Sequence, residues 1–122
     1  MADEGGRGNL IDGVTVRGNH LGANNHLGAL LTGQVHNVTF TGNTFDQNGR
    51  EGLYVANDGV AGVTVSGNTF IQSANGNCQL YCSWYTLAHL EVQAGTPGVT
   101  VSGNTYQPLP PLIVGATDPA PR

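Results

Sequence analysis

The sequence has little charge, and positive charge is its scarcest component. Only 10% of the 122 residues are charged, four of them are Lys or Arg, and the net charge is −4 at neutral pH. A protein that binds nucleic acid needs a basic surface to neutralise the phosphates. The composition therefore argues against a nucleic-acid partner, and net charge provides no attraction toward acidic polysaccharides either.

Cysteines, acidic clusters and long apolar runs are also scarce. The two cysteines, Cys78 and Cys82, are too few for a structural zinc site without other ligands, and they fit a small disulfide or a pair of thiols equally well. No acidic cluster indicates a calcium site, so no metal or cofactor is expected. No run approaches the roughly 18 apolar residues of a membrane span, and the first residues lack the pattern of an export signal.

Glycine, in contrast, is abundant, and it belongs to a repeat. The chain has 19 glycines and is 39% hydrophobic, which is too apolar for a disordered protein. A nine-residue motif, Gly62-Val-Thr-Val-Ser-Gly-Asn-Thr-Phe70 in its third copy, occurs four times. Its first valines are Val14, Val38, Val63 and Val99. The first two periods suit one coil of a solenoid, and the longer third period indicates an insertion.

Within each copy apolar and polar residues alternate, which predicts a strand with one buried face. The Gly-Asn pair that follows favours a sharp bend, because both residues tolerate left-handed backbone conformations. Stacked coils would align the bend asparagines into an amide ladder and the next apolar residues into an interior stack. The expected ladder is Asn19, Asn43, Asn68 and Asn104. The expected stack is Leu21, Phe45, Phe70 and Tyr106.

A second strand is expected between the motifs. Residues 28–32, 52–56 and 89–93 share the alternating pattern at nearly the same distance before the next motif. Their middle positions, Leu30, Tyr54 and Glu91, are predicted to form an outward row. Two strands per coil, with a short third, do not suit a four-stranded propeller blade, and no 3.6-residue period indicates helices.

The motif and the following Asp46-Gln-Asn-Gly-Arg-Glu-Gly-Leu-Tyr-Val55 resemble a coil of the pectin-lyase-like right-handed parallel β-helix superfamily, which includes pectate lyases, mannuronan epimerases and phage tailspikes. The resemblance covers about residues 9–107. It implies an all-β right-handed parallel β-helix of about four coils, with an aromatic loop inserted in the third. Residues 1–8 are expected to be a flexible N-terminus and residues 108–122 a Pro-rich tail or lid.

Enzymes of this superfamily resemble one another in clustering acidic, basic, His or Tyr side chains on the outer face of neighbouring coils. Here the candidate catalytic residues are Tyr54 and Glu91 of the outward row, together with His89 beside it. The inserted loop concentrates aromatic side chains that are able to stack on sugars, anchor a subunit contact or pack on their own coil. The candidate ligand-binding or interface residues are Tyr81, Trp84, Tyr85, Tyr54 and Arg50.

Two observations predict the function. The sequence has few clustered acidic, basic, His or Tyr side chains, and full catalytic members of the superfamily look much longer than this chain. We expect a non-catalytic or accessory module of a polysaccharide-directed protein, most like the distal part of a phage tailspike, forming a homotrimer that is extracellular or virion-associated. The alternative is an active polysaccharide lyase, epimerase or hydrolase. A minor alternative is ice binding by a threonine array, although only the second copy has Thr at both outward positions, Thr39 and Thr41.

Overall fold

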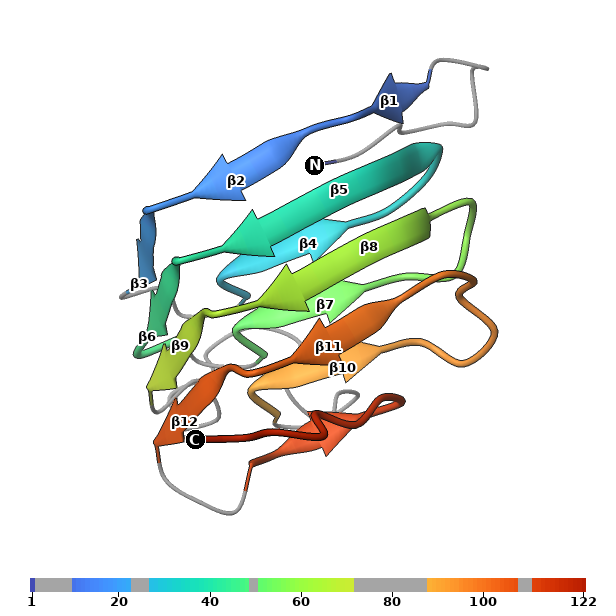
Figure 1. The fold of residues 1–122 in the computed structure, drawn as a ribbon. Helices are drawn as coiled ribbons and strands as arrows, with labels where there is room; N and C mark the ends of the chain where they lie inside the picture. Colours follow the sequence, from blue (N-terminus) through green and yellow to red (C-terminus); the bar gives the residue numbers. More distant parts are fainter. Residues whose placement is uncertain (2–9, 23–26, 49–50, 72–87, 108–110) are drawn as a thin grey trace.

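The computed structural model describes residues 1, 10–22, 27–48, 51–71, 88–107 and 111–122, which form a stack of short parallel strands in three walls (Figure 1). The first wall contains β1 (Ile11–Asp12), β2 (Thr15–Arg17), β5 (Val35–Thr41), β8 (Ala61–Ser66) and β11 (Thr100–Ser102). The second wall contains β3 (His20–Gly22), β6 (Thr44–Asp46), β9 (Thr69–Ile71) and β12 (Thr105–Gln107). The third wall contains β4 (Ala29–Leu31), β7 (Leu53–Val55), β10 (Leu90–Val92) and β13 (Ile113–Val114).

The strand register follows the sequence repeat. On the first wall Thr39 pairs with Thr64, which in turn pairs with Thr100. On the second wall Phe45 pairs with Phe70 in the same parallel sense. The four motif copies therefore occupy successive rungs, and the stack makes about three complete turns, close to the four coils expected. The all-β parallel solenoid predicted from the sequence is confirmed.

Each coil bends between the first and second walls at the glycine of the Gly-Asn pair. Gly18, Gly42, Gly67 and Gly103 have φ values between 66° and 68°. This left-handed conformation costs a residue with a Cβ atom about 1 kcal/mol or more, and glycine adopts it freely. The repeated glycine therefore determines where every coil turns from the first wall to the second.

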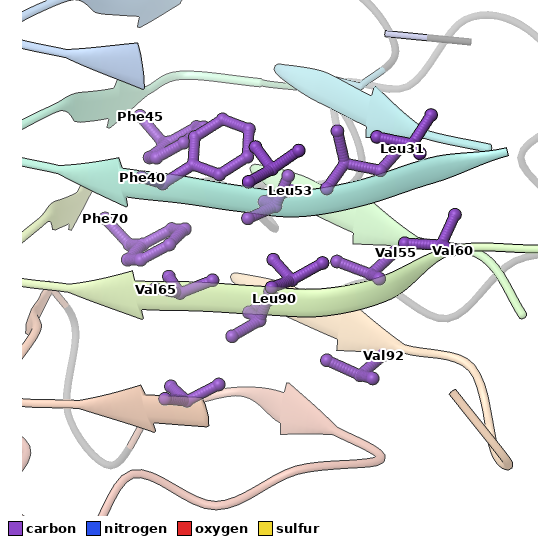
Figure 2. Packing of buried hydrophobic residues seen from close by; sticks show 14 of the residues in the cluster. Leu31, Phe40, Phe45, Leu53, Val55, Val60, Val65, Phe70, Leu90 and Val92 are labelled. Atoms are coloured by element: carbon purple, nitrogen blue, oxygen red, sulfur yellow. The ribbon is translucent and has the colours of Figure 1, made fainter. Parts of the chain in front are cut away.

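The hydrophobic core lies between the three walls (Figure 2). Valines of the first wall face leucines and valines of the third wall, and the aromatic residues of the second wall close the remaining side. The ring centroids of Phe45 and Phe70 are 4.7 Å apart and nearly parallel, and those of Phe70 and Tyr106 are 5.4 Å apart. Stacked aromatic pairs of this kind stabilise a fold by about 1 kcal/mol beyond the burial of their area.

The two ends of the stack differ. At the C-terminal end β13 pairs with β10, and the chain then returns to β12, where Arg122 exchanges backbone hydrogen bonds with Asn104 and Tyr106. At the N-terminal end the core positions of the first rung, including Val16 and Leu21, are only partly buried. Their register partners in the second coil, Phe40 and Phe45, are 2% and 0% exposed. In the part of the chain that the structure describes, the core is therefore covered at the C-terminal end and only partly covered at the N-terminal end.

Candidate functional site

The outward row of the third wall brings two of the candidate catalytic residues together. Tyr54 on β7 pairs in register with Glu91 on β10, and Leu30 on β4 continues the row. Neighbouring strands in a sheet lie about 4.8 Å apart, so the two side chains leave the wall side by side. The register thus places an acid next to a phenol, which is a possible arrangement for proton transfer.

The carboxylate of Glu91 is unusual in its environment. Its Oε1 atom is inaccessible to solvent and accepts no hydrogen bond in the described part of the chain. A buried carboxylate oxygen without a donor is costly, and a catalytic role is one of the explanations for such an atom in a native protein. The catalytic role of Tyr54 and Glu91 stays a prediction.

The sequence predicted that His89 lies at the outer face, beside the outward row, but the structure places its side chain inside. Its side chain is 0% exposed and packs against the rings of Phe70 and Tyr106. Nδ1 accepts a hydrogen bond from the backbone N–H of Leu112 at 3.0 Å, and Nε2 lies 3.3 Å from the carbonyl oxygen of Gln107. Burial lowers the pKa of His89, opposed by the Gln107 carbonyl. The ring is therefore neutral with its proton on Nε2, and it joins β10 to the segment around β13.

The outer faces of the first and second walls carry columns of hydroxyl side chains. These columns are Thr15, Thr39, Thr64 and Thr100; then Thr41, Ser66 and Ser102; and, past the bend, Thr44, Thr69 and Thr105. Arg17 stands at the head of the second column and His20 at the head of the third. The array is therefore regular and almost free of charge, with Arg17 and His20 on its first rung.

A hollow of about 330 Å³ lies at the head of the third column, lined by His20, Gly22, Asp46 and Gln47. Nε2 of His20 is 3.4 Å from Oδ2 of Asp46. Gly22 pairs in register with Asp46, and a Cβ atom at Gly22 would lie 2.5 Å from the carbonyl oxygen of Asp46 and 3.1 Å from Nε2 of His20. The close approach of the neighbouring strand therefore requires glycine here, and the groups around the hollow can donate and accept hydrogen bonds.

The corner beside this hollow, residues 46–48, is bonded to the neighbouring coil by a buried asparagine. Asn48 is 0% exposed, and its Nδ2 donates to the carbonyl oxygen of Leu21 on the neighbouring coil at 3.0 Å. Gln47 has a φ of 55°, which is uncommon for a residue other than glycine. The Asn48 hydrogen bond ties the backbone just after Asp46 and Gln47 to the neighbouring coil.

An asparagine ladder runs through the bends. Nδ2 of Asn19 donates to Oδ1 of Asn43 at 3.3 Å, and the links from Asn43 to Asn68 and from Asn68 to Asn104 are both 3.0 Å. The ladder ends at Asp118, which was not predicted from the sequence; its Oδ2 accepts from Nδ2 of Asn104 at 3.1 Å. The signal available was weak, since Asp118 follows Asn104 by fewer residues than any coil period.

Several residues singled out in the sequence lie outside the described part of the chain. They are Arg50, Cys78, Tyr81, Cys82, Trp84 and Tyr85. Within the described part, no three His, Cys, Asp or Glu side chains are grouped closely enough to hold a metal ion. No helix there has the length and apolar character to span a membrane.

Comparison with known proteins agrees with this architecture. The family model described as the right-handed beta helix region matches residues 5–106. No curated protein and no solved structure matches the chain at a significant level. The match extends over most of the sequence and over all four copies of the motif. The chain therefore belongs to the right-handed β-helix family.

Proposed function

We propose that the chain is a non-catalytic, polysaccharide-directed β-helix module, most like the distal part of a phage tailspike and exposed outside the cell or on a virion. The observation that supports a glycan ligand is the hydroxyl array of the first two walls, which ends at the hollow beside His20 and Asp46. Hydroxyl, carboxylate, imidazole and amide groups offer the donors and acceptors that pair with sugar hydroxyls.

The charge near the hollow favours a neutral sugar. Asp46 contributes a carboxylate, and the chain as a whole has a net charge of −4. A uronate polymer would bring further negative charge to this surface, whereas the two oxygens of a carboxylate accept bonds from neighbouring sugar hydroxyls. We therefore expect neutral glycans to bind better than acidic ones.

A glycan array followed by calorimetric titration of the best neutral ligand tests this proposal. Asp46→Asn is expected to weaken binding by about tenfold, since a charged hydrogen bond is worth roughly 1.5–3 kcal/mol. Asp12→Asn removes the same charge from β1 and keeps an oxygen for Asn37, which now donates to Asp12 at 2.9 Å. This control should bind as the unaltered chain does. An array without hits, or an equal loss in both variants, contradicts the proposal.

Assembly into a homotrimer is part of the same proposal. Leu112 is 43% exposed beside β13, so an apolar side chain is available there for a subunit contact. Multi-angle light scattering should give three times the chain mass of 12.6 kDa. Leu112→Ser should shift that mass toward the monomer without loss of the fold. A monomer at high micromolar concentration contradicts the trimer.

A second candidate function, polysaccharide cleavage at the third wall, is favoured by the unpartnered Oε1 of Glu91 next to Tyr54. A lyase acting on uronate polymers would produce unsaturated ends that absorb ultraviolet light. We expect no such product from this chain. If product does form, Glu91→Gln and Tyr54→Phe should each abolish it, and that result would replace the non-catalytic proposal.

A further inference from the structure

The asparagine ladder has a direction. Oδ1 of Asn43 accepts both the backbone N–H and Nδ2 of Asn19, at 3.0 and 3.3 Å. Oδ1 of Asn68 accepts the same two groups of Asn43, both at 3.0 Å. At every link the donor belongs to the coil nearer the N-terminus. Each coil therefore needs a preceding coil to fill its amide oxygen.

The same amides also bind backward. Nδ2 of Asn43 donates to the carbonyl oxygen of Val16 in the preceding coil at 2.8 Å. The two asparagines that follow make the equivalent bonds, at 2.9 and 3.0 Å. In each coil of the stack, the asparagine Oδ1 thus accepts two hydrogen bonds from the preceding coil, and its Nδ2 donates one hydrogen bond to a backbone carbonyl of that coil.

The first coil has neither of these contacts. No residue in the described part of the chain donates to Oδ1 of Asn19, and apart from Asn43 its Nδ2 reaches only the carbonyl of Arg17, on its own strand. The core side chains Val16 and Leu21 beneath it remain partly exposed. On the third wall Met1 lies along the edge of β4, with backbone bonds to Leu30 and Thr32. Among the described residues, polar and apolar groups are therefore left uncovered together along β2 and β3.

We infer that this N-terminal end is a docking surface for the last coil of a neighbouring parallel β-helix, one that carries Gly-Asn at its bend. Such a coil, in parallel register, supplies two donors to Oδ1 of Asn19 and a carbonyl to its Nδ2. It also covers Val16 and Leu21, as the second coil covers the core below. It displaces Met1 from the edge of β4.

A second copy of the chain does not offer the same chemistry. The C-terminal end is closed, because Asn104 donates to the carboxylate of Asp118 rather than to another amide. In an end-to-end contact, two copies could bring unfilled ladder groups together only through their N-terminal ends. The backbone N–H of Asn19 already donates to Asn43, so it is not available to fill Oδ1 of the opposite Asn19. The surface is matched to a coil that arrives in the same chain direction.

The test extends the full chain by one of its own coils. A copy of residues 34–58 is inserted directly before Leu10. On the first wall Ile11 pairs with Val35 and His36 pairs with Ala61, so an insertion of this length keeps the register from the copied coil to the first coil. Hydrogen exchange of the β2 and β3 amides is then compared with that of the unaltered chain. We expect exchange in β2 and β3 to slow by about tenfold or more, approaching that of β5.

Two controls separate docking from general stabilisation. The Asn43→Leu change made only in the appended copy should remove most of the added protection. The same copy placed after Arg122 should leave exchange in β12 unchanged, since Asp118 closes that end. The inference is overturned if the appended coil leaves β2 and β3 unprotected. It is also overturned if the unaltered chain already protects these strands as well as β5, because then a second copy or the chain itself covers the end. A glycan-binding result does not bear on either outcome.

Discussion

Asn68→Leu is expected to lower the free energy of unfolding by about 3–5 kcal/mol, because several buried polar groups lose a partner at once. The amide of Asn68 accepts two hydrogen bonds from Asn43 and donates to the carbonyl of Phe40 at 2.9 Å and to Asn104 at 3.0 Å. Leucine is close in size but makes none of these bonds. Urea unfolding followed by circular dichroism measures the loss.

The matched control is Asn19→Leu at the open end of the same ladder. Asn19 is exposed, so water can replace the bonds lost there, and the expected loss is below about 1 kcal/mol. Asn43→Leu should fall between the two, at about 1–3 kcal/mol, because its bonds with Asn19 and Val16 lie at the partly buried first coil. Equal losses at all three positions would show that the ladder bonds do not act through burial, and an unchanged unfolding midpoint for Asn68→Leu would contradict a stabilising ladder.

The sequence predicted the walls of this fold because their causes are local and repeated. A strand with alternating valines needs only the period-2 pattern, and the left-handed bend needs only the glycine of Gly-Asn, such as Gly42. The repeat then determines the register, since matching positions stack to bury the same side chains. Buried residues such as Val63 and Phe70 follow directly from that pattern.

His89 shows where a local pattern stops being informative. Alternation counted back from Leu90 predicts an outward side chain, but β10 begins only at Leu90, so the pattern does not extend to the residue before it. The ring is buried because two backbone groups, the N–H of Leu112 and the carbonyl of Gln107, satisfy its nitrogens. Gln107 ends β12 and so belongs to the repeat, but Leu112 lies in the segment just before β13, whose path no periodicity determines.

The hollow beside Asp46 was missed for a related reason. His20 and Asp46 are far apart in the sequence and meet only through the pairing of β3 with β6. A signal existed in the alignment of the copies, where His20 stands in a column of threonines and Gly22 in a column of larger residues. A substitution that breaks a column on the outer face is therefore the feature to search for in other solenoids.

A second large loss of stability is expected at Asp118, which ends the asparagine ladder. Its Oδ2 accepts from the backbone and side chain of Asn104 and from the hydroxyl of Tyr106, at 2.9–3.1 Å. Its Oδ1 accepts from the backbone N–H groups of Gly103 and Ala120, at 2.8 and 3.0 Å. Asp118→Ala leaves these donors without an acceptor at the covered end of the core, and we expect a loss of about 3 kcal/mol in unfolding free energy.

The same residue should make stability depend on acid. Burial acts to raise the pKa of Asp118, but the hydrogen bonds from Asn104, Ala120, Gly103 and Tyr106 together lower it below its ordinary value. A carboxyl whose pKa is lowered by folding stabilises the fold above the pKa of the unfolded chain, about 4, and loses that contribution as the pH falls through its lower folded value. Urea unfolding between pH 2 and 7 should therefore show the unaltered chain losing more stability on acidification than Asp118→Asn, which has no proton to bind.

Tyr106→Phe removes one donor and keeps the carboxylate, so it should be less stable at pH 7 yet retain most of the acid dependence. Parallel pH profiles for the unaltered chain and Asp118→Asn would mean that the carboxylate does not close the ladder.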